Sequence, residues 1–147
     1  MNPQPEPRKF FMSSTNDTPP VISEVWFTHL ANAVQADREL QVIGKYSDFW
    51  IDAVSPGNWR VALNFRNANL APTPWKDLPR DHIVLSATQV GWGRVFDPQP
   101  KPQQHDLLAL AKNSPDVTVG GSDVELVRNL RVLARLVDLG KALHVQH

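Results

Sequence analysis

The residues that could carry out chemistry are few, and their spacing assembles no familiar metal site. The histidines are His29, His82, His105, His144 and His147, and no two are four residues apart on a predicted helix face. That spacing would place two imidazoles side by side, as in many zinc sites. The chain also contains no cysteine, which excludes disulfides, thiolate ligands and cysteine nucleophiles. We therefore expect no bound metal.

Two small groups could still transfer protons. Asp48 and Asp52 share one face of a predicted strand near Tyr46, and paired carboxylates beside a tyrosine can act as acid and base in an apolar pocket. The alternative is that both are solvated strand positions. His105 and Asp106 form a second acid–base pair, and here the alternative is that Asp106 caps a short helix.

No nucleophile or phosphate-binding motif accompanies these groups. Ser86 and Ser114 lack the context of a nucleophile elbow. The glycines around Trp92 and at 120–121 form neither GxGxxG nor a loop with a Walker lysine. The sequence therefore assigns no catalytic residue and no cofactor.

Length and composition indicate one globular domain. The 147 residues suffice for a core, and 41% of them are apolar. The formal net charge is zero, which argues against nucleic-acid binding and permits self-association. No apolar run approaches the ~20 residues of a membrane span, and we find no signal peptide. We expect a cytoplasmic protein without stable membrane insertion.

The pattern predicts a flexible N-terminal arm over residues 1–20, with Phe10-Phe11-Met12 as a tether or simply disordered, and a single α+β domain over residues 21–147. A first helix capped by Ser23 should run to Asp37, and residues 67–80 should form an irregular connection whose Trp75 returns to the core. Short helices are expected over 90–96 and 106–112. Five strands are predicted, in a mostly antiparallel sheet, at residues 40–46, 49–54, 59–65, 83–87 and 117–119.

The last helix carries the strongest signal. Ser122 and Glu125 form a capping box, and Gly140 offers a C-terminal stop. Apart from one polar stripe, nearly all of its positions are apolar. Such a wide apolar surface must be covered by the sheet, by a ligand or by a partner chain. The five tryptophans allow two interpretations as well, either core packing or the wall of a ligand cavity.

The order of these elements resembles the sterol carrier protein type-two family of lipid-binding domains. Four stretches carry the resemblance, at residues 44–52 leading into the strand at Trp59, at 81–88, at 106–111 and at 117–121. The family usually enters its closing segment through Gly-Asp, whereas Ser122 intervenes here between Gly121 and Asp123. The resemblance spans residues 23–143 and implies a five-stranded sheet with a long C-terminal helix over a hydrophobic tunnel. It also implies lipid transport without an enzyme activity of its own.

The resulting hypothesis is that the protein binds a sterol, fatty acid, acyl thioester or similar apolar molecule between sheet and helices. Two alternatives stay open. The first is a small enzyme that acts on an apolar substrate, and the second is an interaction subunit that uses the last helix to form a homodimer or to seat a partner enzyme. The ligand-binding residues are predicted to be Val61, Leu63, Phe65, Trp92, Phe96, Leu107, Leu110, Leu130, Leu133 and Val137.

Overall fold

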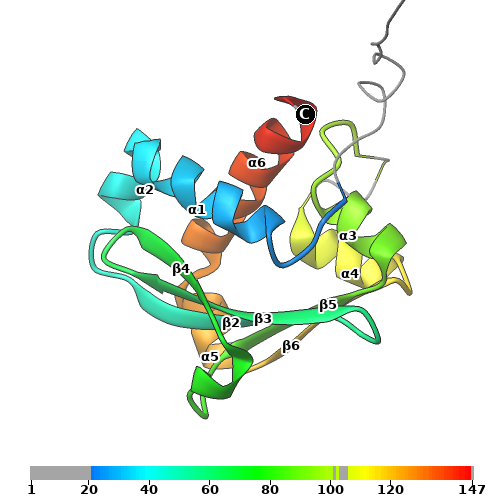
Figure 1. The fold of residues 1–147 in the computed structure, drawn as a ribbon, viewed down its shortest axis with the longest axis horizontal. Coiled ribbons are helices and arrows are strands. Elements are labelled where there is room, and N and C mark those ends of the chain that lie inside the picture. Colours follow the sequence, from blue (N-terminus) through cyan, green and yellow to red (C-terminus); the bar gives the residue numbers. More distant parts are fainter. Residues whose placement is uncertain (1–20, 101, 103–105, 147) are drawn as a thin grey trace, which may run out of the picture.

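The computed structural model describes residues 21–100, 102 and 106–146, so the predicted N-terminal arm and His105 lie outside the described residues. Most of the helices cover one side of a single sheet, and the other side is largely open (Figure 1). The elements in chain order are α1 (Trp26–Ala36), α2 (Arg38–Ile43), β2 (Asp48–Ser55), β3 (Trp59–Arg66), β4 (Asn69–Thr73), the 3-10 turn η2 (Trp75–Asp77), β5 (Ile83–Ala87), α3 (Gln89–Val95), α4 (Leu107–Asn113), β6 (Val117–Gly121), α5 (Asp123–Arg128) and α6 (Leu130–Gln146).

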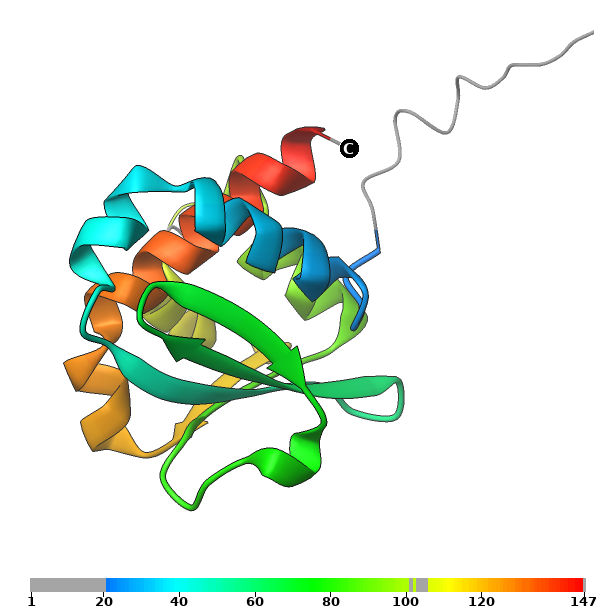
Figure 2. The same cartoon turned by 60° about the vertical axis from the view of Figure 1, so that its left-hand side comes forward.

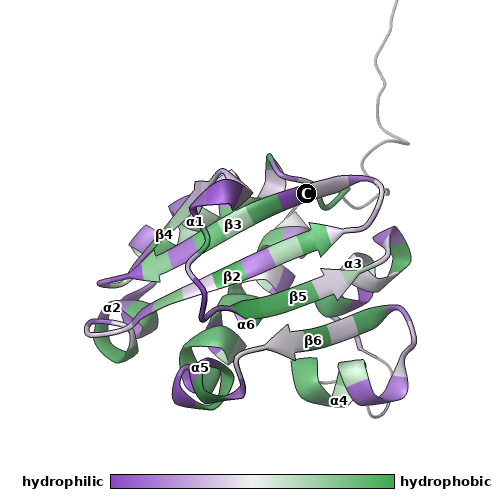
Figure 3. Cartoon of the chain, turned by 90° about the horizontal axis from the view of Figure 1, so that it is seen from below, coloured by the Kyte–Doolittle hydropathy of each residue, from purple (hydrophilic) through white to green (hydrophobic). Residues whose placement is uncertain are grey.

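The five strands lie in the order β4-β3-β2-β5-β6. Three of the four strand pairs are antiparallel, and β2 and β5 are parallel, so the predicted α+β class with a mostly antiparallel sheet is confirmed. Viewed from its open side, the sheet lies in front of α1, α2 and α6, while α4 and α5 lie along the β6 edge (Figure 3).

Strand alternation divides the sheet into an inner face, under the helices, and an outer face. Phe49, Ile51 and Ala53 of β2 are buried on the inner face, as are Val61, Leu63 and Phe65 of β3. The period of two sends Asp48, Asp52, Arg60 and Asn64 to the outer face. The alternation expected for the strand that begins at Trp59 is therefore confirmed.

Two predictions of secondary structure are wrong. One predicted strand is a helix, and one predicted connection contains a strand, so the number of strands is still five. The segment expected as a strand at residues 40–46 is helix α2, which Asp37 caps by accepting a hydrogen bond from the Leu40 amide at 3.0 Å. The segment expected as an irregular connection contains β4, which pairs with β3. Trp75 does not return to the core, because η2 lies beyond the outer face (Figure 2) and leaves Trp75 46% exposed.

The helix termini also depart from the prediction. Ser23 does not cap α1 with its side chain, since the N-cap is Val25 and makes no side-chain hydrogen bond. The last helix is not continuous, because it breaks at the buried Asn129, whose side chain donates to the Glu125 carbonyl at 2.9 Å. Gly140 does not end α6, which continues to Gln146. There the absence of a side chain lets Phe96 and Trp26 pack against the helix.

Candidate functional site

An apolar groove of about 510 Å³ separates α4 from α6. The N-terminal turn of α4 contributes Leu107, Leu108 and its N-cap Asp106, and α6 contributes the opposite wall. Leu108 and Leu130 are 40% and 38% exposed, so apolar side chains reach the surface at its mouth. The α6 wall consists of Leu130, Leu133, Ala134, Val137 and Asp138.

A second, much smaller space lies between the inner face of the sheet and helices α1, α3 and α6. Its volume is about 20 Å³, which holds roughly one water molecule. Side chains thus fill nearly all of the interior in this structure. The lining is entirely apolar or aromatic and consists of Phe27, Leu30, Ile51, Leu63, Leu70, Leu85, Trp92, Phe96, Leu133, Leu136 and Val137.

Leu133 and Val137 line both the groove and the inner cavity. They are only 3% and 7% exposed and occupy successive turns of α6. A single layer of aliphatic side chains therefore separates the surface groove from the interior. Rotation of these two side chains would join the two spaces.

The structure brings together seven of the ten predicted ligand-binding residues. The inner cavity is lined by Leu63, Trp92, Phe96, Leu133 and Val137. The groove is lined by Leu107 and Leu130, and also by Leu133 and Val137. The remaining three, Val61, Phe65 and Leu110, are buried in the core but line neither space.

Several lining residues were not expected from the sequence. Leu136 carried a usable signal, because it follows Leu133 by three positions on the same helix face. Leu70 carried none, because the pattern over residues 67–80 predicts an irregular connection rather than a strand. The others are Phe27, Leu30, Ile51 and Leu85 in the cavity and Asp106, Leu108, Ala134 and Asp138 in the groove.

Phe27 is the centre of an aromatic cluster at the cavity. Its ring centroid lies 5.3 Å from that of Trp26, 5.6 Å from Trp59 and 5.7 Å from Trp92, each in an edge-to-face arrangement. The Trp92 indole donates to the Val54 carbonyl at 3.2 Å. The indole nitrogens of Trp26 and Trp59 are buried, and neither has a hydrogen-bond partner among the described residues.

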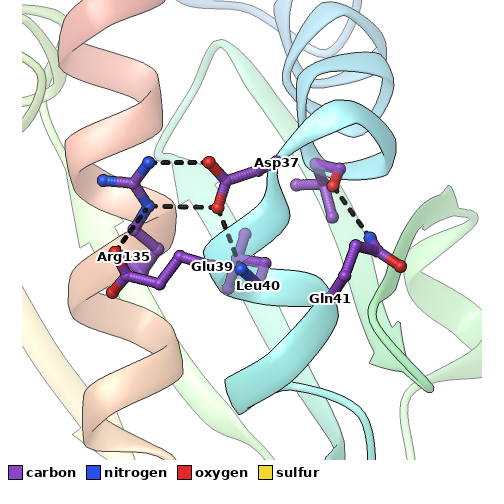
Figure 4. Close-up of polar contacts among 6 residues, drawn as sticks. Asp37, Glu39, Leu40, Gln41 and Arg135 are labelled. Atoms are coloured by element: carbon purple, nitrogen blue, oxygen red, sulfur yellow. Dashed lines mark hydrogen bonds and ion pairs between the residues drawn. The ribbon is translucent and has the colours of Figure 1, made fainter.

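An ion pair fixes α6 over the cavity. Arg135 donates two hydrogen bonds to the Asp37 carboxylate, at 3.1 and 2.6 Å, and also lies 3.7 Å from a Glu39 oxygen (Figure 4). The hydrogen bonds from Arg135 lower the pKa of Asp37, against the opposing effect of burial, and the Leu40 amide lowers it further. Because Asp37 also caps α2, one carboxylate joins the α1–α2 junction to the helix that carries Leu133 and Val137.

Of the described groups considered for proton transfer, Asp106 alone lines one of these spaces, the groove. Tyr46 is 88% exposed, and the Asp48 side chain is 58% exposed. Asp52 is buried on the outer face, where Arg60 binds both of its oxygens at 2.9 and 2.8 Å. Asp106 caps α4 by accepting from the Ala109 amide at 2.8 Å, as the simpler interpretation had it.

Two further features of the described part of the chain bear on function. It contains no cluster of three or more histidine, aspartate or glutamate side chains arranged to hold a metal ion. None of its helices combines the length and apolar character that a bilayer span requires.

Comparison with known proteins identifies the fold. No family model and no curated protein sequence matches the chain. Among solved structures, it is similar to a sterol carrier protein 2, with 11% identity, a TM-score of 0.61, and coverage of 83% of this chain and 98% of the other. A conserved hypothetical protein from Thermus thermophilus, described as a possible sterol carrier protein, has 12% identity, a TM-score of 0.58, and coverage of 86% and 92%.

A third similar structure is UbiJ-SCP2, a ubiquinone synthesis protein, with 18% identity, a TM-score of 0.53, and coverage of 76% of this chain and 90% of the other. All three structures carry the name of the sterol carrier fold in their descriptions. The chain therefore has a sterol-carrier-like fold, as the resemblance in its sequence implied.

Proposed function

We propose that the protein binds an apolar small molecule, such as a sterol, fatty acid or acyl thioester, and carries it without catalysing a reaction on it. The observation that carries this proposal is the shared wall of the groove and the inner cavity at Leu133 and Val137. The groove volume of about 510 Å³ lies within the range of about 300–1,000 Å³ that is usual for small-molecule sites. The names of the similar structures agree with this function.

Burial of the ligand would supply the binding energy. Each square ångström of apolar surface removed from water contributes roughly 25 cal/mol, before the cost of ordering the ligand. Because the inner cavity holds only about 20 Å³, a ligand first occupies the groove. It reaches the interior only when side chains such as Leu133 move aside.

Native mass spectrometry of protein purified from cells, followed by organic extraction, tests the proposal directly. We expect a mass excess over the bare chain, and we expect the extract to contain a lipid or similar apolar compound. A protein that carries no adduct, and that also takes up no sterol, fatty acid or acyl thioester when these are offered, contradicts the proposal.

A tryptophan in the groove should block uptake without disturbing the core. Ala134 lines the groove and is exposed, so the Ala134→Trp side chain would occupy the groove itself. We expect ligand uptake to fall at least tenfold with the thermal midpoint nearly unchanged. Ala142→Trp is the matched control, because Ala142 is exposed on the same helix but does not line the groove. Equal uptake by both variants would place the ligand elsewhere.

An interaction subunit is a second candidate function, favoured by the exposed apolar side chains of α5. Val124 and Val127 are 62% and 73% exposed, and Leu130 follows at the start of α6. Native mass spectrometry separates the two functions. A dimer without adduct that dissociates when Val127 is changed to Asp would favour this alternative, in which protein rather than ligand covers the apolar surface.

A further inference from the structure

Two tryptophans, the buried Trp26 and the half-buried Trp59, carry buried indole N–H groups that no described residue satisfies. Trp26 is 3% exposed, and the indole nitrogens of Trp26 and Trp59 are both inaccessible to solvent. Within the part of the chain that the structure describes, neither nitrogen has a hydrogen-bond partner. Buried polar groups are almost always paired, and the neighbouring Trp92 follows that rule through the Val54 carbonyl.

We propose that the carried molecule has an uncharged oxygen acceptor, such as the carbonyl of a ketone or an ester, which binds to the indole N–H groups of Trp26 and Trp59. This inference rests on the proposed function, and it specifies the chemical class of the ligand at the same site. Trp59 and Trp26 thereby become specificity-determining residues, whereas Trp92 serves the fold.

The position of the two indoles relative to the inner cavity supports this assignment. Trp26 lies against Phe96, with ring centroids 4.4 Å apart, and Trp59 lies against Trp92, with centroids 5.2 Å apart. Both also contact Phe27. Since Phe27, Trp92 and Phe96 line the cavity, the rings of Trp26 and Trp59 lie directly behind its aromatic wall. A ligand that displaces the Phe27 ring would lie against both tryptophan rings.

The charges around the site argue against an anionic ligand end. The inner cavity is lined only by aliphatic and aromatic side chains, so a carboxylate or phosphate there would be desolvated without a cation. Among the described residues, the ionisable ones that line the groove are Asp106 and Asp138, and both would repel an anion. A neutral acceptor avoids both costs and satisfies the indole donors.

Three probes of equal chain length separate these possibilities, namely octadecane, methyl octadecanoate and octadecanoate. The protein is loaded from phosphatidylcholine vesicles that contain all three compounds in equal amounts. It is then separated from the vesicles, and the bound compounds are quantified by gas chromatography. Partitioning from the vesicles is the same for every variant, so a change in the ester-to-hydrocarbon ratio between variants reports on the protein alone.

We expect Trp59→Phe and Trp26→Phe each to lower the ester-to-hydrocarbon ratio about fivefold, the usual effect of one neutral hydrogen bond, while octadecane loading stays unchanged. Trp75→Phe is the control, because Trp75 lies over Arg60 on the outer face, with the guanidinium 4.5 Å from its ring centroid, and should leave the ratio as in the wild type. Circular dichroism verifies that each variant is folded.

An unchanged ratio in both Trp26→Phe and Trp59→Phe overturns the inference, as does preferential loading of octadecanoate by the wild type. Uptake of none of the three probes, nor of a sterol or an acyl thioester offered in the same way, contradicts the proposed function itself. A second measurement needs no variant. The indole N–H resonances of Trp26 and Trp59 in ¹⁵N-labelled protein should move downfield on loading with the ester but not with octadecane, and resonances that do not respond would contradict the assignment.

Discussion

The two faces of the sheet differ in how their buried polar groups are paired. On the outer face, Arg60 satisfies both oxygens of Asp52 and also lies under the ring of Trp75. On the inner face, a dense aromatic cluster leaves the indole donors of Trp26 and Trp59 unpaired among the described residues, next to a small cavity. The outer face has one unpaired buried group as well, the Thr73 hydroxyl, which shares that face with Asp52. On the inner face, by contrast, the two unpaired donors belong to an aromatic cluster that borders a cavity.

Under the proposed function, the ligand would bind on the inner face. Polar groups in a protein interior are normally satisfied by the fold itself, so two unpaired donors in a cluster that borders a cavity are candidates for pairing with a ligand. Figure 2 shows that α1 and α6 pack over this inner side, whereas only the short turn η2 lies beyond the outer face. The predictions below compare matched positions in the two regions, from the largest expected effect to the smallest.

The largest contrast should come from truncating one aromatic ring on each face. Phe27 is 1% exposed and contacts four aromatic rings, so Phe27→Ala should lower the free energy of unfolding by about 3–5 kcal/mol. Trp75→Ala should cost no more than about 1 kcal/mol, the value of a partly exposed cation–π contact. Urea unfolding followed by circular dichroism measures both, and equal losses would refute the contrast between the faces.

Each region also holds one bidentate aspartate–arginine pair, and the two pairs should contribute differently to the free energy of unfolding. Asp37→Asn separates α2 from α6, whose residues are 98 positions apart at this contact, and should cost about 2–3 kcal/mol. Asp52→Asn disturbs a pair within one hairpin whose Arg60 side chain is 41% exposed, so about 1 kcal/mol is expected. Thermal unfolding at pH 7 tests the order, and a costlier Asp52→Asn would reverse it.

The cost of Asp37→Asn should depend on pH. The pKa of Asp37 is lowered in the folded protein, chiefly by the hydrogen bonds from Arg135. A carboxyl group of this kind contributes its stabilisation above its unfolded value of about 3.9 and loses it as the pH falls through the lower folded value. The difference in midpoint between wild type and variant should therefore be full at pH 7 and shrink below about pH 4. A constant difference would show that the ion pair is not its source.

The sequence predicted the elements whose own residues determine them. The alternation from Trp59 to Phe65 indicated both a strand and its buried face, and Asp106 and Ser122 act as helix caps, as their side-chain hydrogen bonds show. The α6 side of the groove followed from the spacing of Leu130, Leu133 and Val137. Local pattern was sufficient in these places.

The sequence failed where distant contacts override local preference. Hairpin β3–β4 turns through Asn67 and Ala68 with φ of 50° and 64°, a region that alanine rarely occupies. Three hydrogen bonds hold this turn, from the Ala68 amide to Gly44, from the Asn67 amide to Ser47, and from the Gln41 side chain to the Ala68 carbonyl. These partners come from α2 and the loop after it. The residues of the turn therefore do not by themselves predict it, nor do they predict the cavity residue Leu70 that follows it.

The smallest predicted effects concern two helical glycines. Replacement by alanine should lower the free energy of unfolding at one of them and raise it at the other. A methyl group at Gly140 would lie 2.3 Å from Phe96 and 3.0 Å from Trp26, so Gly140→Ala should destabilise the protein by about 1–2 kcal/mol, since the strain exceeds the gain in helix propensity. At Gly93 a methyl group would meet nothing within 4 Å, and Gly93→Ala should stabilise by up to about 1 kcal/mol. Chemical denaturation resolves both changes. If Gly140→Ala were also stabilising, the aromatic cluster would have room to relax, and the entry of a ligand beside Phe27 would need less rearrangement than the packing of Trp26 and Phe96 implies.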